Sequence, residues 1–320
     1  MKLDVDDDIR KAKTIPSKFY YSPKIYRKLK KIFKRSWQFI GDTDLLEENN
    51  VHPDILLEGM VDEPYVLTKD GENIRCLSNV CTHRGTIVCE KATKTKNLVC
   101  GYHGRQFHID GKMKFMPEFE DVENFPSESD NLPRIEMDMW KKMIFIINDK
   151  KCDISELIGP MIERLSWLPI QEFKYKPELS RIYNVKANWA LYCDNYLEGF
   201  HIPFVHKDLN QTLEYDEYFT EGIDNTVLQI GIGKDNENTF DLPENHQDYG
   251  KNVAAYYFFL FPNMMFNFYP WGLSVNVVKP KSPEETQIEY FTYVWKEEFM
   301  EKGAGSGLDK VELEDEEVVE

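Results

Sequence analysis

Two short metal-binding patterns constrain this 320-residue chain more than any other feature. The first reads Cys81-Thr-His83, and the second reads Cys100-Gly-Tyr-His103. Structural zinc sites usually use pairs of the form Cys-x2–4-Cys and His-x3–5-His. Mixed pairs of one cysteine and one histidine instead suit a [2Fe–2S] cluster, with two cysteines on one iron and two histidines on the other. The spacing therefore predicts a cluster bound by these four residues, with a zinc site as the alternative.

From Trp37 to about Asn148 the sequence resembles the Rieske domain of the ring-hydroxylating oxygenases. The resemblance rests on Cys-Thr-His-Arg-Gly, Cys-Gly-Tyr-His-Gly, Asp-Gly-Lys at 110–112 and Pro117. Rieske proteins of respiratory complexes carry an extra disulfide between the ligand loops, and this chain has no cysteine at either place. The family usually has Trp after His-Gly, where this chain has Arg105. We expect Arg105 to alter packing against the catalytic domain or a neighbouring subunit.

Residues 187–206 contain a second candidate metal site, with acids at Asp194 and Glu198 and histidines at His201 and His206. On an unbroken helix the two histidines would point about 140° apart. We expect Pro203 to end the helix, so that a turn brings His206 back towards His201. Two imidazoles and a carboxylate form the facial triad of non-haem Fe(II) oxygenases. The alternative is a pair of ordinary histidines near a helix end.

The segment Cys-Asp-Asn-Tyr-Leu-Glu-Gly-Phe-His at 193–201 is similar to the choline-monooxygenase-like members of the same oxygenase family. The resemblance implies that Glu198 links a histidine of the iron site to a Rieske histidine of the adjacent subunit. A carboxylate suits this role because it accepts hydrogen bonds from both rings and fixes their tautomers. Asp194 is a candidate to support the same network or a ligand histidine. The alternative for Glu198 is a surface acid at a helix end.

The family takes its third iron ligand from a carboxylate on a C-terminal helix, and 308–320 is an acidic helical run. In the resembling proteins the ligand Asp often follows Glu and precedes another Glu by five residues, which implies Asp315. The alternative is a solvated acidic helix face. The chain stops inside this run without a cap, so we expect a truncation after Glu320. The candidate acids in this run are Glu312, Glu314, Asp315, Glu316 and Glu317.

The pattern along the chain predicts an α+β architecture in three parts. Residues 1–36 form a helical segment that packs on the body, and 37–150 form an all-β domain. Residues 151–320 form a catalytic domain with an antiparallel sheet, which the resemblance implies is of the helix-grip (START-like) type. Helices are expected over 23–35, 151–168, 188–200 and 308–320, and strands over 65–68, 74–77, 143–147, 226–232, 253–261, 264–269, 273–278 and 287–295.

Charge and hydropathy exclude some classes of function. The net charge of −17 argues against a nucleic-acid binder, which depends on contacts to phosphates. The most apolar stretch, 253–271, is interrupted by prolines and asparagines, so no membrane span is expected. The N-terminus lacks the basic region and apolar run of a signal peptide, which makes a cytoplasmic location the default.

These patterns together predict the terminal component of a Rieske-type oxygenase. Electrons from NAD(P)H would arrive through a separate reductase or ferredoxin, since the chain has no Gly-x-Gly-x-x-Gly fingerprint. They would pass from the cluster to a mononuclear Fe(II), which activates O2 to hydroxylate a small organic substrate. The resemblance implies a homotrimer. The competing hypotheses are an electron-transfer or binding protein whose second iron site is not functional, and a zinc-stabilised binding module.

The aromatic-rich stretch 256–271 bears on the substrate. An aromatic cage for a quaternary ammonium group would use such residues. Packing of strands in the core would use them equally well. The likeness to choline monooxygenases suggests a quaternary ammonium substrate, and an aromatic ring stays open.

Overall fold

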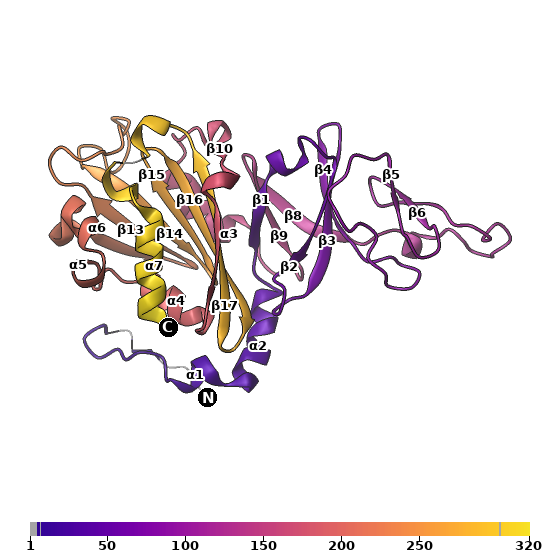
Figure 1. The fold of residues 1–320 in the computed structure, drawn as a ribbon, viewed down its shortest axis with the longest axis horizontal. Helices are drawn as coiled ribbons and strands as arrows, with labels where there is room; N and C mark the ends of the chain where they lie inside the picture. The colour runs from indigo at the N-terminus through magenta and orange to yellow at the C-terminus, as the bar shows by residue number, and fades with distance from the viewer. Residues whose placement is uncertain (1–4, 7, 301) are drawn as a thin grey trace. The chain divides into compact units, whose positions relative to one another are not determined.

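Three sheets organise the residues that this computed structural model describes, which are 5–6, 8–300 and 302–320. The contacts within the chain group these residues into two units (Figure 1). One unit consists of residues 34–175, and the other joins the N-terminal residues through Phe33 with residues 176–320. Helix α3 (Ser155–Arg164) therefore belongs to the first unit, although we expected it in the second domain.

The unit of residues 34–175 contains a six-stranded and a three-stranded antiparallel sheet. The strands expected over 65–68, 74–77 and 143–147 are confirmed, and each lies in the larger sheet. In spatial order that sheet is β1 (Gln38–Asp42), β9 (Met143–Ile147), β8 (Arg134–Trp140), β4 (Asn73–Ser78), β3 (Glu63–Asp70) and β2 (Val51–Leu56), and the smaller one is β5 (Asn97–Val99), β6 (Gln106–His108) and β7 (Met113–Phe115).

The apolar core of this unit includes the two cysteines of the predicted cluster. Val66, Leu77 and Phe107 are completely buried, and Cys81 and Cys100 belong to the same core cluster. Packing in this core therefore anchors the two ligand loops and makes them less flexible than loops on the surface.

The other unit is built on one antiparallel sheet whose order from β17 is β17-β16-β15-β14-β13-β12, with β11 also paired to β17. Helix α4 (Trp189–Tyr196) contacts both β16 and α7 (Leu308–Val319), so the two helices lie on the same face. Figure 1 shows α7 running across this sheet. The strands are β11 (Arg181–Val185), β12 (Phe219–Ile223), β13 (Thr226–Ile232), β14 (Val253–Leu260), β15 (Met264–Tyr269), β16 (Gly272–Ser282) and β17 (Glu285–Val294).

The composition of these strands explains their places. All eight residues of β14 are buried, as expected for a central strand rich in aromatic and aliphatic side chains. In β17 the buried residues alternate with partly exposed ones, so only one face of that strand is covered. The strands expected over 226–232, 253–261, 264–269, 273–278 and 287–295 are confirmed to within a few residues, apart from a longer β16.

The expected N-terminal amphipathic helix is α2 (Pro23–Phe33), which follows the one-turn helix α1 (Lys18–Tyr21). Its buried residues are Tyr26, Leu29 and Phe33, while Ile32 is exposed, so the apolar stripe differs slightly from the one that the aliphatic spacing predicts. Phe33 contacts Trp189 of α4 edge to face, with ring centroids 5.1 Å apart. This contact places the N-terminal helices against the unit that contains α4.

None of the helices that the structure describes has the length and hydropathy needed to span a bilayer. The elements not yet named are all short. They are α5 (Ile202–Val205), α6 (Lys207–Thr212), the two-residue strand β10 (Lys174–Tyr175) and the 3-10 helices η1 (Thr43–Leu46), η2 (Glu128–Asp130), η3 (Ile170–Glu172), η4 (Pro177–Leu179), η5 (Tyr215–Glu217), η6 (Glu297–Phe299) and η7 (Gly303–Gly305).

Candidate metal centres

The two Cys/His loops fold in the same way. In the first, the amide of Cys81 donates to the carbonyl of Thr86 at 2.8 Å, and Gly85 donates back to Cys81 at 2.9 Å. In the second, Cys100 donates to Arg105 at 2.8 Å, and the glycine at the matching position donates back to Cys100 at 3.1 Å. Both glycines have a positive φ, which allows these tight loops. Two equivalent loops can close around one inorganic group.

The four predicted cluster ligands have the environments that such a group needs. Cys81 and Cys100 are buried, whereas His83 is partly exposed and His103 exposed. The two imidazole rings lie edge to face with centroids 4.7 Å apart. The Nδ1 atom of His83 is buried and has no hydrogen-bond partner among the described residues. An inward ring nitrogen without a partner fits a ligand of the cluster, so the donor set passes this test.

Arg105 lies inside the first unit and not at its surface. Its side chain is 3% exposed, and its guanidinium lies 2.5 Å from Asp130 Oδ1. It also lies over the rings of Phe107 and Phe125, at 5.7 Å from each centroid. Arg105 thus has a local role, because its charge is paired within the unit. An effect on packing against another domain or subunit stays a prediction.

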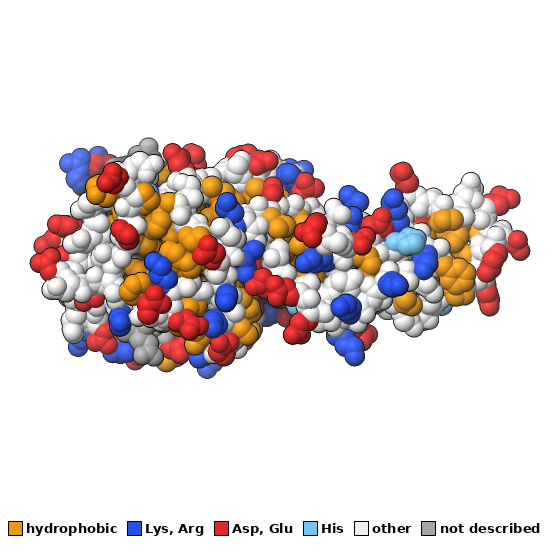
Figure 2. All heavy atoms as spheres, turned by 90° about the horizontal axis from the view of Figure 1, so that it is seen from above, with side chains coloured by type: hydrophobic (Ala, Val, Ile, Leu, Met, Phe, Trp, Pro, Cys, Tyr) orange, Lys and Arg blue, Asp and Glu red, His pale blue; other side chains and the backbone are white. Residues whose placement is uncertain are grey.

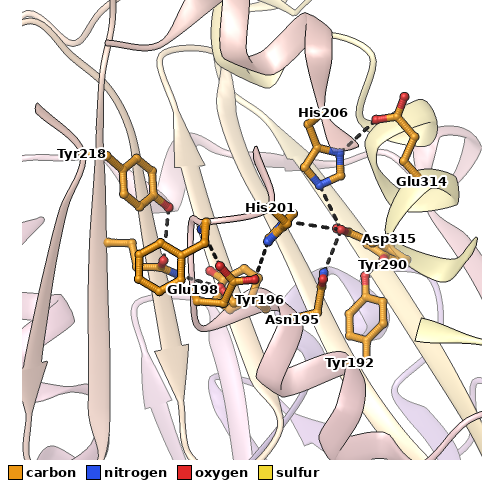
Figure 3. A network of polar contacts seen from close by, with 12 residues as sticks. Tyr192, Asn195, Tyr196, Glu198, His201, His206, Tyr218, Tyr290, Glu314 and Asp315 are labelled. Carbon is orange, nitrogen blue, oxygen red and sulfur yellow. Dashed lines mark hydrogen bonds and ion pairs between the residues drawn. The ribbon is translucent and has the colours of Figure 1, made fainter. Parts of the chain in front are cut away.

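The second unit brings His201, His206 and Asp315 together, with one ligand atom from each within 4.8 Å of the others. Asp315 Oδ1 lies 2.9 Å from His206 Nε2 and 3.7 Å from His201 Nε2 (Figure 3). His206 is 2% exposed, and the side chains of His201 and Asp315 are 15% and 18% exposed. Two imidazoles and one carboxylate that converge from one side fit a mononuclear Fe(II) with open positions.

The chain reaches this geometry differently from the prediction. Helix α4 already ends at Tyr196, and Pro203 lies in the first turn of the new helix α5 instead of ending an old one. Proline suits that position because the amide it lacks has no partner in a first helical turn. His201 precedes α5 and His206 follows it, so one helical turn separates them and their ring centroids lie 5.0 Å apart.

Carboxylates fix the orientation of both histidines. Glu198 Oε1 lies 2.8 Å from His201 Nδ1, and Glu314 Oε2 lies 2.9 Å from His206 Nδ1. Each contact leaves Nε2 facing Asp315, the arrangement expected of metal-binding histidines. Burial by itself lowers the pKa of His206, but its hydrogen bonds and charge interactions with Asp315 and Glu314 outweigh this and raise that pKa.

Asp194 lies outside this cluster. Its carboxylate accepts a hydrogen bond of 2.5 Å from Tyr20 Oη, so in this structure it joins the N-terminal segment to α4 and supports neither histidine. The neighbouring Asn195 instead donates to Asp315 Oδ1 at 2.7 Å. Sequence reasoning missed this role of Asn195 and the role of Glu314. Neither residue carries a sequence signal for its role, because each role depends on a tertiary contact with Asp315 or His206.

A cavity opens beside the three convergent residues, with about 710 Å³ not occupied by protein atoms when its open mouth is included. No lysine or arginine is among the described residues that line it. From the aromatic stretch, Tyr257 and Tyr269 line the cavity, whereas residues such as Phe258 and Phe266 are completely buried in the core. The other tyrosines that line it are Tyr192, Tyr196 and Tyr218.

A site for an electron-transfer cluster and a separate facial triad beside a cavity, both in one chain, define a class of enzyme. That class is the Rieske non-haem iron oxygenases, in which the first centre supplies electrons to the second. The helix-grip-like sheet crossed by α7 agrees with this class.

Comparison with known proteins confirms the class. The Rieske [2Fe–2S] domain family matches residues 36–126, and the family of ring hydroxylating alpha subunits (catalytic domain) matches residues 166–320. The chain therefore belongs to the Rieske ring-hydroxylating oxygenase family, whose members carry a [2Fe–2S] cluster and a mononuclear non-haem iron. Members of this family use O2, a small-molecule substrate and a separate electron donor.

Relatives of known activity cover nearly the whole chain. Choline monooxygenase of Spinacia oleracea is 26% identical over 95% of this chain and 70% of its own length. The carnitine monooxygenase oxygenase subunit of Escherichia coli is 28% identical over 92% of this chain and 78% of its own length. The chain spans 59% to 70% of the length of the plant choline monooxygenases that it matches. A solved quaternary ammonium Rieske monooxygenase shares the fold, with a TM-score of 0.78 and 23% identity over 97% of this chain and 84% of that one.

Proposed function

We propose that this chain is the terminal oxygenase component of a system that hydroxylates a small quaternary ammonium compound. Cys81, His83, Cys100 and His103 would hold the [2Fe–2S] cluster. His201, His206 and Asp315 would hold Fe(II), and their convergence beside the cavity is the observation that carries the proposal. Electrons would come from NAD(P)H through a separate reductase or ferredoxin.

Bound iron would supply the activation of O2, and the residues around it would prepare the site. Glu198 and Glu314 keep Nδ1 of each histidine occupied, so that Nε2 is available. Asn195 holds Asp315 in place through its hydrogen bond of 2.7 Å. The tyrosine-lined cavity would hold the substrate next to the triad and exclude bulk water.

The cavity favours a quaternary ammonium over an aromatic ring as the group that is recognised. Both bind to aromatic walls, but only a cation is also attracted by an acid without a basic partner. Glu312 is such an acid in the cavity wall, and no lysine or arginine is among the described residues that line the cavity. The relatives named for choline and carnitine support the same class of substrate.

A role for Glu198 between subunits is part of the proposal. Its side chain is 35% exposed while it holds His201, so it can accept a further hydrogen bond. The resemblance implies that this bond comes from a Rieske histidine of the next subunit in a homotrimer. Light scattering of the purified protein would test the trimer. We further propose that the protein is cytoplasmic and that its partners include neither a membrane nor a nucleic acid.

Metal and sulfide analysis of protein purified without oxygen tests the proposed function. Wild type is expected to contain about three irons and two acid-labile sulfides per chain. A variant with His201→Ala and His206→Ala should retain about two irons and both sulfides. Two irons in both proteins, after reloading with Fe(II), would contradict the oxygenase and leave an electron carrier. Zinc in a colourless protein would instead indicate a binding module.

A further inference from the structure

Glu312 is a buried acid without a partner in the cavity wall. It is 7% exposed, and it forms no hydrogen bond or ion pair with any described residue. Burial, together with the charges of Asp309, Asp315 and Glu316, raises the pKa of Glu312 well above its usual range. The Arg181 guanidinium opposes this shift only in part, and it lies 3.6 Å from Asp309. A buried carboxylate that no cation balances is costly unless a ligand balances it.

The position of Glu312 on α7 directs it to the substrate space. Leu308, Val311, Glu312 and Asp315 all line the cavity, and their spacing corresponds to one face of a helix. Glu312 and the proposed iron ligand Asp315 are three residues apart, so they are separated by roughly 5 Å along the helix axis. A small molecule can therefore contact Glu312 with one end while its other end lies near the triad.

The tyrosines around this space offer mainly their rings. The hydroxyl of Tyr196 donates to Asn267 at 2.7 Å, and the hydroxyl of Tyr218 donates to Gln229 at 3.2 Å. The hydroxyl of Tyr192 is hydrogen bonded to that of Tyr290. These three tyrosines offer a ligand their aromatic faces, which attract cations. Tyr257 also lines the cavity, and its hydroxyl has no hydrogen-bond partner among the described residues, so it is available to a hydroxyl group of a ligand.

The other acids of the cavity have partners. Glu198 accepts hydrogen bonds from the backbone of Phe200 and contacts His201, and Asp315 is proposed as an iron ligand. Glu312 is therefore the acid that can pair with a substrate, because a cation bound beside it would favour its ionised form. A substrate carboxylate would meet this charge, with no lysine or arginine among the described lining residues to balance it.

We propose that Glu312 is the counter-charge for the ammonium head group of the substrate, and that the cavity selects cations without a carboxylate. It would therefore prefer a choline-like alcohol to a carnitine-like zwitterion. This inference rests on the proposed function and names the substrate within the quaternary ammonium class.

Isothermal titration of the iron-loaded protein under nitrogen tests the inference with three probes. These are choline, its neutral isostere in which carbon replaces nitrogen, and carnitine. We expect choline to bind at least tenfold more tightly than either of the other two, which corresponds to about 1.4 kcal/mol. Glu312→Gln should reduce the preference for choline over its isostere at least tenfold. Glu317→Gln, which makes the same charge change on the exposed face of α7, should keep it.

The wild-type measurements do not depend on whether the variant folds. Equal binding of choline and its isostere would overturn the role of charge, and binding of carnitine as tight as that of choline would overturn the selectivity. A Glu312→Gln protein with unchanged melting temperature and unchanged preference would overturn the role of Glu312. Iron analysis of the same samples separates these results from the proposed function. Full iron without choline preference refutes only the inference, and choline preference without a mononuclear iron refutes only the oxygenase.

Discussion

Arg105 shows how a single residue can replace an aromatic neighbour of the cluster. Its guanidinium lies over the rings of Phe107 and Phe125, 5.7 Å from each centroid, and its charge is paired with Asp130. Burial by itself raises the pKa of Asp130, but the backbone amide of Ser127 and the Arg105 guanidinium outweigh this and lower it. The ion pair thus stabilises the first unit while Asp130 is ionised.

Arg105→Met should lower the free energy of unfolding by about 2 kcal/mol at neutral pH, since Asp130 loses its partner but keeps some access to water. A group with a lowered folded pKa stabilises the fold above its unfolded pKa and loses this effect as pH falls through the folded one. The gap between wild type and variant should therefore shrink below about pH 4. Urea unfolding at neutral pH and below about pH 4 measures the difference in stability between wild type and variant. Arg134→Met, at an exposed position, is the control. A gap independent of pH would contradict the assignment to the ion pair.

Glu314 contacts His206, whereas Glu317 on the same helix is exposed. Glu314→Gln should weaken binding of Fe(II) about 10- to 100-fold, as is typical for loss of a partner behind a metal ligand. Glu317→Gln should leave it unchanged. Competition with a chromophoric chelator would measure both affinities, and equal affinities in the two variants would show that Glu314 does not orient the ring.

The candidate ligands were accessible from sequence because cluster and triad histidines occur at short, restrictive spacings. Asp315 was reached through resemblance, since one acid in an acidic run has no distinguishing pattern. Asn195 and Glu314 could not be assigned in this way, because their roles depend on tertiary distances to Asp315 and His206. Asp194 is the neighbour of Asn195 in the sequence, but it lies on another face of α4, where it accepts a hydrogen bond from Tyr20.

At the scale of elements, the strands of the large sheet were predictable and the helical segment before His206 was not. Long apolar runs bounded by turns identify strands directly. The segment 197–206 instead depends on where α4 ends, and Pro203 is compatible with both the end and the start of a helix. The expected domain boundary at 150 likewise differs from the division of the structure at 175, because no pattern in the sequence indicates that α3 packs with the first unit.

Gly305 connects the sheet to α7 through a close approach. A Cβ atom at this position would lie 2.8 Å from Tyr269 Cδ1 and still closer to the indole nitrogen of Trp271, which donates to the carbonyl of Gly305. Gly305→Ala should therefore destabilise the fold by about 2 kcal/mol and weaken Fe(II) binding, because displaced η7 moves α7 and with it Asp315. Calorimetric melting and iron titration measure the two effects. Gly222→Ala is the matched control, because a Cβ atom there would meet nothing within 4 Å. A normal iron affinity in Gly305→Ala would show that η7 does not determine the position of Asp315.

At the scale of the whole molecule, acids outnumber bases. On the face drawn in Figure 2, acidic and basic side chains are interspersed, although the net charge is −17. A surface of this kind lacks the extended basic field that binds phosphates non-specifically.

The two candidate metal centres belong to separate units, each with its own apolar core. Cys81 and Cys100 lie within one core, whereas the exposed His103 does not, so His103→Ala removes a cluster ligand with little loss of packing. We expect this variant to lose the visible absorption of the cluster and to keep about one iron per chain and the affinity for choline. Exposed His108→Ala, in the same unit, should keep both iron centres. Loss of the mononuclear iron together with the cluster would instead show that the second site depends on the first, because folding of one unit would then require the other.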